Sequence, residues 1–441
     1  MKKADSTPHE LASVKGLRDL VGEDCFAYQG LVEKASEIAL YYGFTPIETP
    51  ILEHEDLFAR GIGQATDIVS KEMYTLRTRG GDLLALRPEF TAPMMRAYVE
   101  HGFQSWPQPV MLYTAGPLFR HDKPQRGRFR QFYQFDLEIL GTGKSIADAM
   151  IIKLTMLIVA EAGLAAATLR INSIGDKECR GNYRRELLNY YKKNLRQICP
   201  DCRERLKTNP LRALDCKDPR CEAVKQGAPT ALGFLCPACK SHFKEVLEYL
   251  DEMGLEYEID HTLVRGLDYY SRTVFEVVEM APSADVVLAD EAAPPAAALA
   301  VAGGGRYDYL ARALGHKKDI AAVGAAVGID RLMLSPHFVR HNPRIVKKPK
   351  AFFIQLSFDA KLKSLAVIEI LRKAKIPIAQ SISKDSLGVQ LGIAEKLQVP
   401  YTIILGQKEA IDNTVIVRNM QNRSQDFVPI AKLGEYLKGL K

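Results

Sequence analysis

The strongest constraint on the fold is a strand, loop and strand pattern between residues 110 and 141. The apolar segment MLYTAGPLFR precedes the loop, and FRQFYQFDLEIL, which alternates apolar and polar residues, follows it. This pattern predicts a long antiparallel hairpin whose second strand turns one face to a core: Tyr133, Phe135, Leu137 and Ile139. The opposite face should carry Phe132, Gln134, Asp136 and Glu138, beside Arg120 of the first strand. Polar groups are costly to bury without partners, so that face should contact either solvent or a polar ligand.

The loop between these strands, residues 121–128, is rich in cations. With its flanks it holds one acid, Asp122, and five cations: Arg120, Lys123, Arg126, Arg128 and Arg130. Guanidinium groups bind phosphate bidentately, and Pro124 and Gly127 favour a turn that folds back over a nucleotide. The loop is therefore either a polyphosphate site or a solvated basic hairpin tip.

The wording of this stretch, FRHxxPQxGRxRQFxQ, resembles the second signature motif of class II aminoacyl-tRNA synthetases, and of histidyl-tRNA synthetases in particular. Upstream, residues 26–42 read as an amphipathic helix, followed by a turn at Gly43 and the strand FTPIETPIL. This pair resembles the first motif of the class, which builds the dimer interface in that family and so implies a homodimer. An ordinary core helix and strand would fit the same residues.

Residues 75–87 predict two strands around a turn at 79–82, and Pro88 ends the pairing. The following Arg-Pro-Glu-x-Thr resembles the segment that holds the amino group of histidine in histidyl-tRNA synthetases. The resemblance implies that Glu89, Phe90 and Thr91 belong to the histidine site, and a carboxylate beside a hydroxyl suits an ammonium group. Alternatively, Glu89 simply favours the start of a helix at Thr91.

The segment GTGKS, residues 141–145, mimics the end of a phosphate loop but lacks its first glycine, because position 138 is Glu. We expect Ser145 and Asp148 to cap the apolar helix that runs toward Gly163 instead.

Residues 177–253 are charged, helical and rich in cysteine, which predicts an inserted domain. Two C-x2-C pairs have the spacing of a tetrahedral zinc site, and two further cysteines lie between them: Cys199 and Cys202, Cys216 and Cys221, Cys236 and Cys239. In a cytoplasmic chain such cysteines would not be structural disulfides. Cys25 and Cys179 are left over, and small buried thiols are common, so both a structural zinc and a metal-free core remain open.

The stretch LVRGLDYYSRTVFEV, residues 263–277, matches the histidine-specific signature of histidyl-tRNA synthetases. The match implies that Arg265 offsets the charge that develops between the histidine carboxylate and the α-phosphate of ATP. It places Tyr269 and Tyr270 at the imidazole ring, which an aromatic wall with hydroxyl groups can stack and hydrogen-bond. The alternative is a strand whose tyrosines belong to the core.

Residues 281–302 are rich in Ala, Pro and Asp and predict a peripheral, mobile loop. The glycines of the following AGGGRYDYL allow close backbone approach, and Tyr307 resembles another histidine contact of the family. AAVGAAVGIDRLML, residues 321–334, resembles the third motif of the class, which implies that Arg331 packs on the nucleotide and its γ-phosphate. The helix dipole disfavours a guanidinium near a helix start, and an anionic ligand would remove that penalty.

The last part of the chain is basic. From Pro336 onward 18 Lys and Arg face 8 Asp and Glu, a net charge of +10, whereas the first 335 residues carry a net charge of −3. This asymmetry favours a polyanion such as RNA as a partner, although a solubilising charge balance would also explain it. Residues 336–350 read as a linker, and the alternating strands and helices beyond it resemble the anticodon-binding domain of the class.

Taken together, the resemblance implies an α+β fold, with a class II antiparallel sheet flanked by helices, an inserted helical domain and a carboxy-terminal three-layer α/β domain. The expected boundaries are 1–176 and 254–335 for the two parts of the catalytic core, 177–253 for the insert, 336–350 for the linker and 351–441 for the anticodon-binding domain. A chain of 441 residues with 47% apolar content can build several cores. It has neither a signal-like amino terminus nor a long apolar run, so we expect a cytoplasmic protein that does not span a membrane.

The expected activity is ligation of L-histidine to tRNA(His) through a histidyl-adenylate, with ATP and Mg²⁺. The catalytic residues implied are Arg120 and Arg265. The histidine site would comprise Glu89, Phe90, Thr91, Arg120, Gln134, Glu138, Arg265, Tyr269, Tyr270 and Tyr307. The ATP site would comprise Arg120, Arg128 and Arg331. The rival is a histidine-binding regulatory paralogue without ligase activity, which the intact signature and basic tail disfavour.

Overall fold

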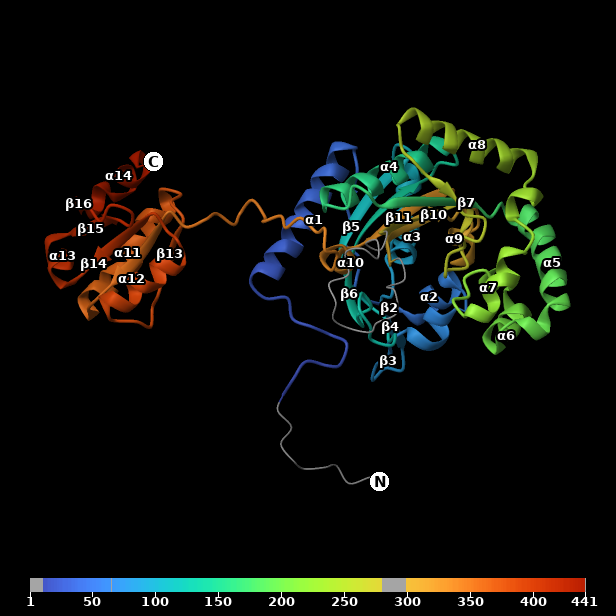
Figure 1. Cartoon of the computed structure of the whole chain (residues 1–441), viewed down its shortest axis with the longest axis horizontal. Coiled ribbons are helices and arrows are strands. Elements are labelled where there is room, and N and C mark those ends of the chain that lie inside the picture. The colour runs from blue at the N-terminus through green and yellow to red at the C-terminus, as the bar shows by residue number, and fades with distance from the viewer. Residues whose placement is uncertain (1–10, 65, 280–298, 441) are drawn as a thin grey trace, which may run out of the picture. The chain divides into compact units, whose positions relative to one another are not determined.

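The computed structural model describes residues 11–64, 66–279 and 299–440 (Figure 1). The chain divides into two compact units, Met1–Pro343 and Arg344–Lys441, and each has its own hydrophobic core. Within the described residues, no helix combines the length and the apolar character needed to cross a membrane.

Unit 1 is built on a mixed sheet of eight strands. In spatial order they are β1 (Thr45–Pro46), β5 (Val110–Phe119), β6 (Gln131–Leu140), β11 (Ala322–Gly328), β10 (Leu299–Arg306), β9 (Ser271–Glu279), β7 (Thr168–Ser173) and β8 (Glu258–Ile259). The six central strands, β5, β6, β11, β10, β9 and β7, pair antiparallel with their neighbours. At the two edges, the short strand β1 pairs parallel with β5, and β8 pairs parallel with β7. The expected antiparallel sheet is confirmed.

The hairpin of β5 and β6 is the predicted one, with Gly116 opposite Gln134. On β6, Phe135, Leu137 and Ile139 are buried in one core, as their alternation predicted. On the other face, Asp136 and Glu138 are only 2% and 1% exposed. Solvent therefore does not wet that face at these two carboxyl groups, which makes them candidates for a ligand site.

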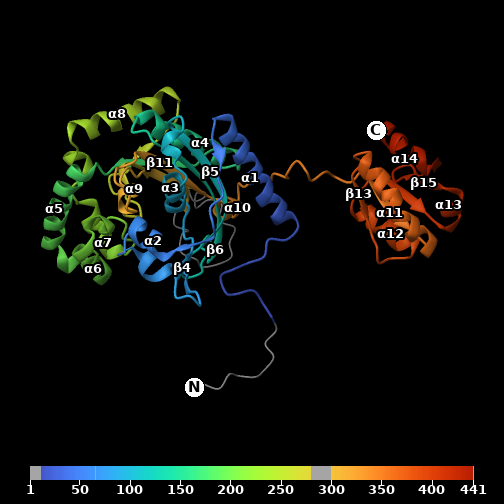
Figure 2. The same ribbon diagram turned by 180° about the vertical axis from the view of Figure 1, so that it is seen from behind.

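Helices cover both faces of the sheet (Figure 2). One core includes apolar residues of α1 (Glu23–Tyr41), α4 (Ser145–Glu161), α8 (Pro237–Glu252) and α10 (Ile329–Met333). The other includes residues of α2 (Glu55–Ile62), α3 (Thr91–Glu100) and α9 (Leu310–Ala313). The second core surrounds the polar side of β6.

The single strand expected after α1 was wrong, because the chain there joins two sheets. β1 pairs with β5, whereas β2 (Leu52–His54) pairs with β4 (Leu83–Leu86) in a separate sheet of order β2-β4-β3 that includes β3 (Thr75–Arg77). Pro50 lies between the two short strands and has no backbone N–H for a sheet ladder, which favours a break there. The predicted hairpin of β3 and β4 is confirmed.

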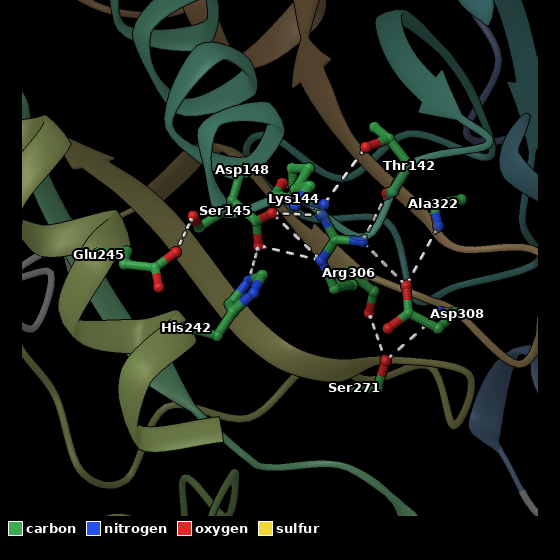
Figure 3. A network of polar contacts seen from close by, with 10 residues as sticks. All are labelled: Thr142, Lys144, Ser145, Asp148, His242, Glu245, Ser271, Arg306, Asp308 and Ala322. Atoms are coloured by element: carbon green, nitrogen blue, oxygen red, sulfur yellow. Dashed lines mark hydrogen bonds and ion pairs between the residues drawn. The ribbon is translucent and has the colours of Figure 1, made fainter. Parts of the chain in front are cut away.

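The predicted cap formed by Ser145 and Asp148 was also wrong. Neither side chain caps α4; the Ser145 hydroxyl donates to Glu245 at 2.5 Å, and Asp148 forms a fully buried ion pair with Arg306. Figure 3 shows this pair within a network in which His242 of α8 also contacts Asp148. A buried guanidinium needs a counter-charge, and this requirement outweighs local capping.

The segment predicted as an insert is helical and lies along one side of unit 1 (Figure 1). Its helices are α5 (Lys177–Lys193), α6 (Pro200–Thr208), α7 (Pro219–Gln226) and the start of α8, joined by short 3₁₀ turns. The two C-x2-C pairs do not share one cluster, as a single site would require: Cys199 and Cys202 lie with Cys216 and Cys221, while Cys236 and Cys239 lie with Cys179. Local spacing alone could not reveal this partition.

Most of the loop predicted between residues 281 and 302 lies outside the described residues. Residues 299–302 are not loop but the start of β10, paired with β9 on one side and β11 on the other.

Unit 2 is a three-layer α/β domain, as predicted. Its sheet has the order β13 (Ile378–Gln380), β12 (Ala351–Gln355), β14 (Tyr401–Leu405), β15 (Thr414–Asn419) and β16 (Gln425–Pro429). Its helices are α11 (Phe358–Lys373), α12 (Leu387–Lys396), α13 (Gln407–Asp412) and α14 (Leu433–Gly439). Along β12, Phe353 packs in the core with α11 and α14, and Phe352 packs in the core with α12. Each face is therefore covered by helix.

Candidate active site

Glu138 of β6 is the centre of the polar side of the sheet in unit 1. Its Oε1 accepts a hydrogen bond of 2.7 Å from the Thr91 hydroxyl, and its Oε2 accepts one from the Tyr307 hydroxyl. A Cβ atom on Gly324, in the neighbouring strand β11, would lie 1.5 Å from Oε2. The Glu138 carboxyl group therefore occupies space that is free only because position 324 of β11 is glycine.

Burial raises the pKa of Glu138 to about 8, although the hydrogen bonds from Tyr307 and Thr91 oppose the shift. Burial also raises the pKa of Glu89 to about 7, opposed by the backbone N–H groups of Ala92 and Thr91. These two acids lie close enough for the charge of Glu89 to act on Glu138, and a cation bound beside them would favour the charged form of both.

Glu89 lies at the start of α3, where both alternatives considered from the sequence meet. Its carboxylate accepts hydrogen bonds from the backbone N–H groups of Thr91 at 2.7 Å and Ala92 at 3.1 Å. Glu89 therefore stabilises the start of α3, as one alternative expected. A carboxylate has acceptor capacity beyond these bonds. Phe90 is fully buried in the second core, with the Arg87 guanidinium 4.4 Å from its ring centre.

Three tyrosines form an aromatic wall beside Glu138. The ring centres of Tyr269 and Tyr270 are 4.7 Å apart, and those of Tyr269 and Tyr307 are 5.7 Å apart. Burial raises the pKa of all three, so their hydroxyl groups stay protonated and can donate. Arg180 of α5 donates to the backbone oxygen of Tyr270 at 2.7 Å, which links the insert to this wall.

Arg265 lies next to the wall, 6.0 Å from the ring centre of Tyr270. Its Nη1 forms an ion pair with Glu276 of β9, a partner that the sequence had not singled out although it lies in the same signature stretch. A Cβ on Gly303 would come within 2.6 Å of Nη1, and one on Gly304 within 2.1 Å of the Gly324 oxygen. The Arg265 guanidinium therefore fits only because Gly303 has no side chain, and β10 and β11 pack this closely only because Gly304 has none.

Arg331 lies near Arg265 and near two further arginines, Arg120 and Arg128. The Arg120 Nε donates to the Pro88 oxygen at 2.9 Å, and Arg128 pairs with Asp122 at 2.9 Å. Arg331 donates to the oxygens of Ala300 and Gly127. Burial, followed by the charges of Arg120, Arg128 and Arg265, lowers the pKa of Arg331 to about 10. Such mutual repulsion is relieved by a polyanionic ligand.

Two residues of the predicted polar face complete the site. Gln134 lies opposite Gly116 on one side and Gly328 on the other, on the same face of β6 as Glu138. Asp136, to which the sequence assigned no role, has a buried Oδ1 without a hydrogen-bond partner among the described residues. Burial, reinforced by Glu138, holds its pKa well above the usual range.

The structure thus brings most of the predicted histidine residues into one buried cluster, with the predicted ATP residues nearby. A family model described as histidyl-tRNA synthetase matches residues 16–332, and one described as an anticodon binding domain matches residues 350–440.

Curated relatives match over nearly the full length. The histidine–tRNA ligase of Dehalococcoides mccartyi strain CBDB1 is 40% identical over 96% of this chain and 97% of its own length. That of Desulforamulus reducens is 39% identical over 96% of this chain and 98% of its own.

Solved structures agree. The apo histidyl-tRNA synthetase of S. aureus superposes with a TM-score of 0.77 at 30% identity, covering 97% of this chain and 100% of its own. A Nostoc histidyl-tRNA synthetase (TM-score 0.63, 20% identity, covering 97% of this chain and 99% of its own) shares the fold. The chain belongs to the histidyl-tRNA synthetase family.

Proposed function

We propose that this chain is a histidine–tRNA ligase, which joins L-histidine to tRNA(His) at the expense of ATP. The observation that carries the proposal is the contact of two features in unit 1. A buried cluster of acids and tyrosines around Glu138 lies beside a group of four arginines: Arg120, Arg128, Arg265 and Arg331. The two groups meet where the charge of Arg120 acts on Glu89 and where Arg265 lies 6.0 Å from the ring centre of Tyr270. The first suits a small cationic amino acid and the second suits a triphosphate.

In this cluster, Glu89 and Thr91 would bind the α-ammonium group of histidine, as the family resemblance implies. Glu138 and Tyr307 form one hydrogen-bonded pair that can hold the imidazole nitrogens, since a carboxylate accepts and a hydroxyl can both accept and donate. Tyr269 and Tyr270 would stack on the ring, and Gln134 lies on the same face.

In the first step, an oxygen of the histidine carboxylate attacks the α-phosphorus of ATP, and the bond to the β,γ-pyrophosphate breaks. Histidyl-adenylate and pyrophosphate result. Arg120 and Arg265 would stabilise the charge on the α-phosphate, while Arg128 and Arg331 would hold the outer phosphates. ATP enters as its Mg²⁺ complex. No nucleophilic side chain is needed, because positioning and charge stabilisation lower the barrier.

In the second step, a hydroxyl of the terminal ribose of tRNA attacks the carbonyl carbon of the adenylate, and AMP leaves. Unit 2 would bind the tRNA, since the chain from Pro336 onward carries a net charge of +10. We also propose the domain boundaries given above, a homodimer, and a place in the cytoplasm, from the resemblance to the family.

The regulatory-paralogue alternative is disfavoured, because the arginine group and unit 2 are both present. Exchange of labelled pyrophosphate into ATP decides between the two. We expect exchange that depends on histidine and on no other standard amino acid, followed by charging of tRNA(His). Folded protein that binds histidine without exchange would support the paralogue instead.

A further inference from the structure

Four cysteines from three segments of the insert converge in its core. They form the four-cysteine cluster, which comprises Cys199, Cys202, Cys216 and Cys221. All four are buried, and their sulfur atoms lie within 4.8 Å of one another. The sulfur atoms of Cys199 and Cys216 are 3.7 Å apart, and those of Cys202 and Cys221 are 3.8 Å apart.

A second group lies where the insert meets the sheet of unit 1. This three-cysteine cluster comprises Asp176, Cys179, Cys236 and Cys239, and its ligand atoms also lie within 4.8 Å of one another. The Oδ2 atom of Asp176 is 3.2 Å from the sulfur of Cys239 and 3.7 Å from that of Cys236. A carboxylate among three thiols is poorly explained by apolar packing of small side chains.

The spacings match those of a tetrahedral metal site. With Zn–S bonds of about 2.3 Å and Zn–O bonds of about 2.0 Å, a tetrahedron has S–S edges of about 3.8 Å and S–O edges of about 3.5 Å. A disulfide has an S–S distance of about 2.0 Å, whereas the sulfur atoms of these two pairs lie 3.7 and 3.8 Å apart, as ligands of one metal ion would.

Both C-x2-C pairs use the same local structure. Cys199 and Cys236 are the N-cap residues of α6 and α8, each followed by proline, and each sulfur accepts the backbone N–H of the cysteine three residues on, at 3.4 Å. Helix starts favour negative charge, so they stabilise thiolates.

Further backbone N–H groups donate to three of the remaining sulfur atoms. Cys199 donates to the sulfur of Cys221 at 3.2 Å, and Asp218 donates to that of Cys216 at 3.4 Å. In the other cluster, Cys236 donates to the sulfur of Cys179 at 3.0 Å. Such bonds orient metal ligands and compensate their charge, and they are typical of built metal sites.

We propose that the insert holds two structural zinc ions, one with four cysteine ligands and one with three cysteines and Asp176. Each binding event displaces thiol protons, because the thiolate is the ligand. Four protein ligands close the coordination sphere, so neither ion has an open position for a substrate.

The positions of the clusters suggest what the ions hold in place. Cys179 is followed directly by Arg180, which donates to the backbone oxygen of Tyr270 in the aromatic wall. Asn209, which follows the end of α6, donates to Asp268 at 2.8 Å. Both clusters thus anchor segments that contact the stretch carrying Tyr269 and Tyr270.

The direct test is the metal content of the full chain, purified without a metal-binding tag and without chelators. Mass spectrometry of the elements should find two zinc ions per chain. Folded, metal-free protein whose eight cysteines all react with a thiol reagent after denaturation would overturn the proposal, and so would disulfides within either cluster.

Variants assign each ion to its cluster. Cys202→Ser and Cys239→Ser should each lose one zinc ion, whereas Cys25→Ser, in α1 and outside both clusters, should keep two. Asp176→Asn leaves the N-cap of α5 intact, since Asn caps as well as Asp, but should weaken zinc binding at one cluster only. A wild-type content of one ion that only Cys202→Ser removes would overturn the three-cysteine site.

Cobalt substitution gives a readout that needs no variant. The two sites should yield thiolate-to-cobalt absorption from seven Co–S bonds in total, with half of the cobalt in an all-sulfur site. Cobalt that binds without this absorption would contradict cysteine ligation. None of these measurements depends on ligase activity, so they stand or fall separately from the proposed function.

Discussion

The Tyr307 hydroxyl donates a hydrogen bond to the Glu138 carboxyl group, although the two residues are 169 positions apart in the sequence. Both side chains are buried. Because burial raises the pKa of Glu138 to about 8, the folded state binds its proton more tightly than the unfolded state does. The resulting stabilisation is complete below the ordinary carboxyl pKa and is lost as pH rises through about 8.

We therefore expect the urea midpoint of unit 1 to fall between about pH 6 and about pH 9, and to fall less in Glu138→Gln. Trp106, the only tryptophan, lies in unit 1, so its fluorescence can follow this unit. Glu89 and Asp136 titrate in both proteins, and the difference isolates Glu138. An identical fall in the variant would show that the Glu138 carboxyl group does not hold the proton.

Arg265→Ala should lower the rate of histidine-dependent pyrophosphate exchange by about 10²–10³-fold, because it removes a donor aimed at charge that develops in the transition state. Histidine binding, measured by calorimetry, should persist. Arg170→Ala is the matched control, since Arg170 forms a partly exposed ion pair with Glu258 on the same sheet. An unchanged exchange rate in Arg265→Ala would show that this residue does not stabilise the charge that develops at the α-phosphate.

Gly324→Ala should abolish adenylate formation, since its Cβ would lie 1.5 Å from the Glu138 carboxylate and must displace it. Gly143→Ala provides the control, because a Cβ there would meet its nearest neighbour, Ala321, at an ordinary 3.7 Å. Comparing kcat/KM for histidine in the two variants tests the idea. Normal activity in both would mean that the Glu138 carboxylate is not needed in this position.

Asp148→Ala should lower the free energy of unfolding of unit 1 by about 3 to 5 kcal/mol, because it leaves the buried Arg306 guanidinium without its main counter-charge. Glu258→Ala, which breaks the partly exposed pair with Arg170, should cost less than about 1 kcal/mol. Urea unfolding followed by Trp106 fluorescence gives both values. An equal loss of unfolding free energy in the two variants would contradict the idea that burial makes the Asp148–Arg306 pair the more important one.

Removal of the residues after Lys350 should weaken tRNA binding while leaving pyrophosphate exchange intact. Unit 1 has its own cores, and the predicted ATP and histidine residues all lie within it. Filter binding of tRNA at several salt concentrations should show a smaller salt dependence in the truncated chain, because phosphate contacts are lost. Loss of exchange would mean that unit 2 supports the catalytic fold.

The sequence predicted best where a pattern is local. Period-two alternation correctly separated Phe135 and Leu137 from Asp136 and Glu138, because side chains of a strand alternate whatever lies around it. The motifs likewise pointed to residues that the structure gathers in one buried cluster around Glu138.

The errors concern partners that are distant in the sequence. Asp148 pairs with Arg306 and does not cap α4, and the two C-x2-C pairs belong to two different clusters. Nothing in the spacing of such residues records which of them meet. Proline at position 50 did carry a signal for the broken strand, but how the two halves pair depends on both sheets.

The glycine floor built from Gly303, Gly304 and Gly324 limits how the site can change. A surface of bare backbone has no rotamers to adjust, and any side chain added there collides with Arg265, with the facing strand or with Glu138. Its shape is fixed by the sheet itself. Engineering this chain to accept a different amino acid must therefore change the tyrosine wall and keep the three glycines.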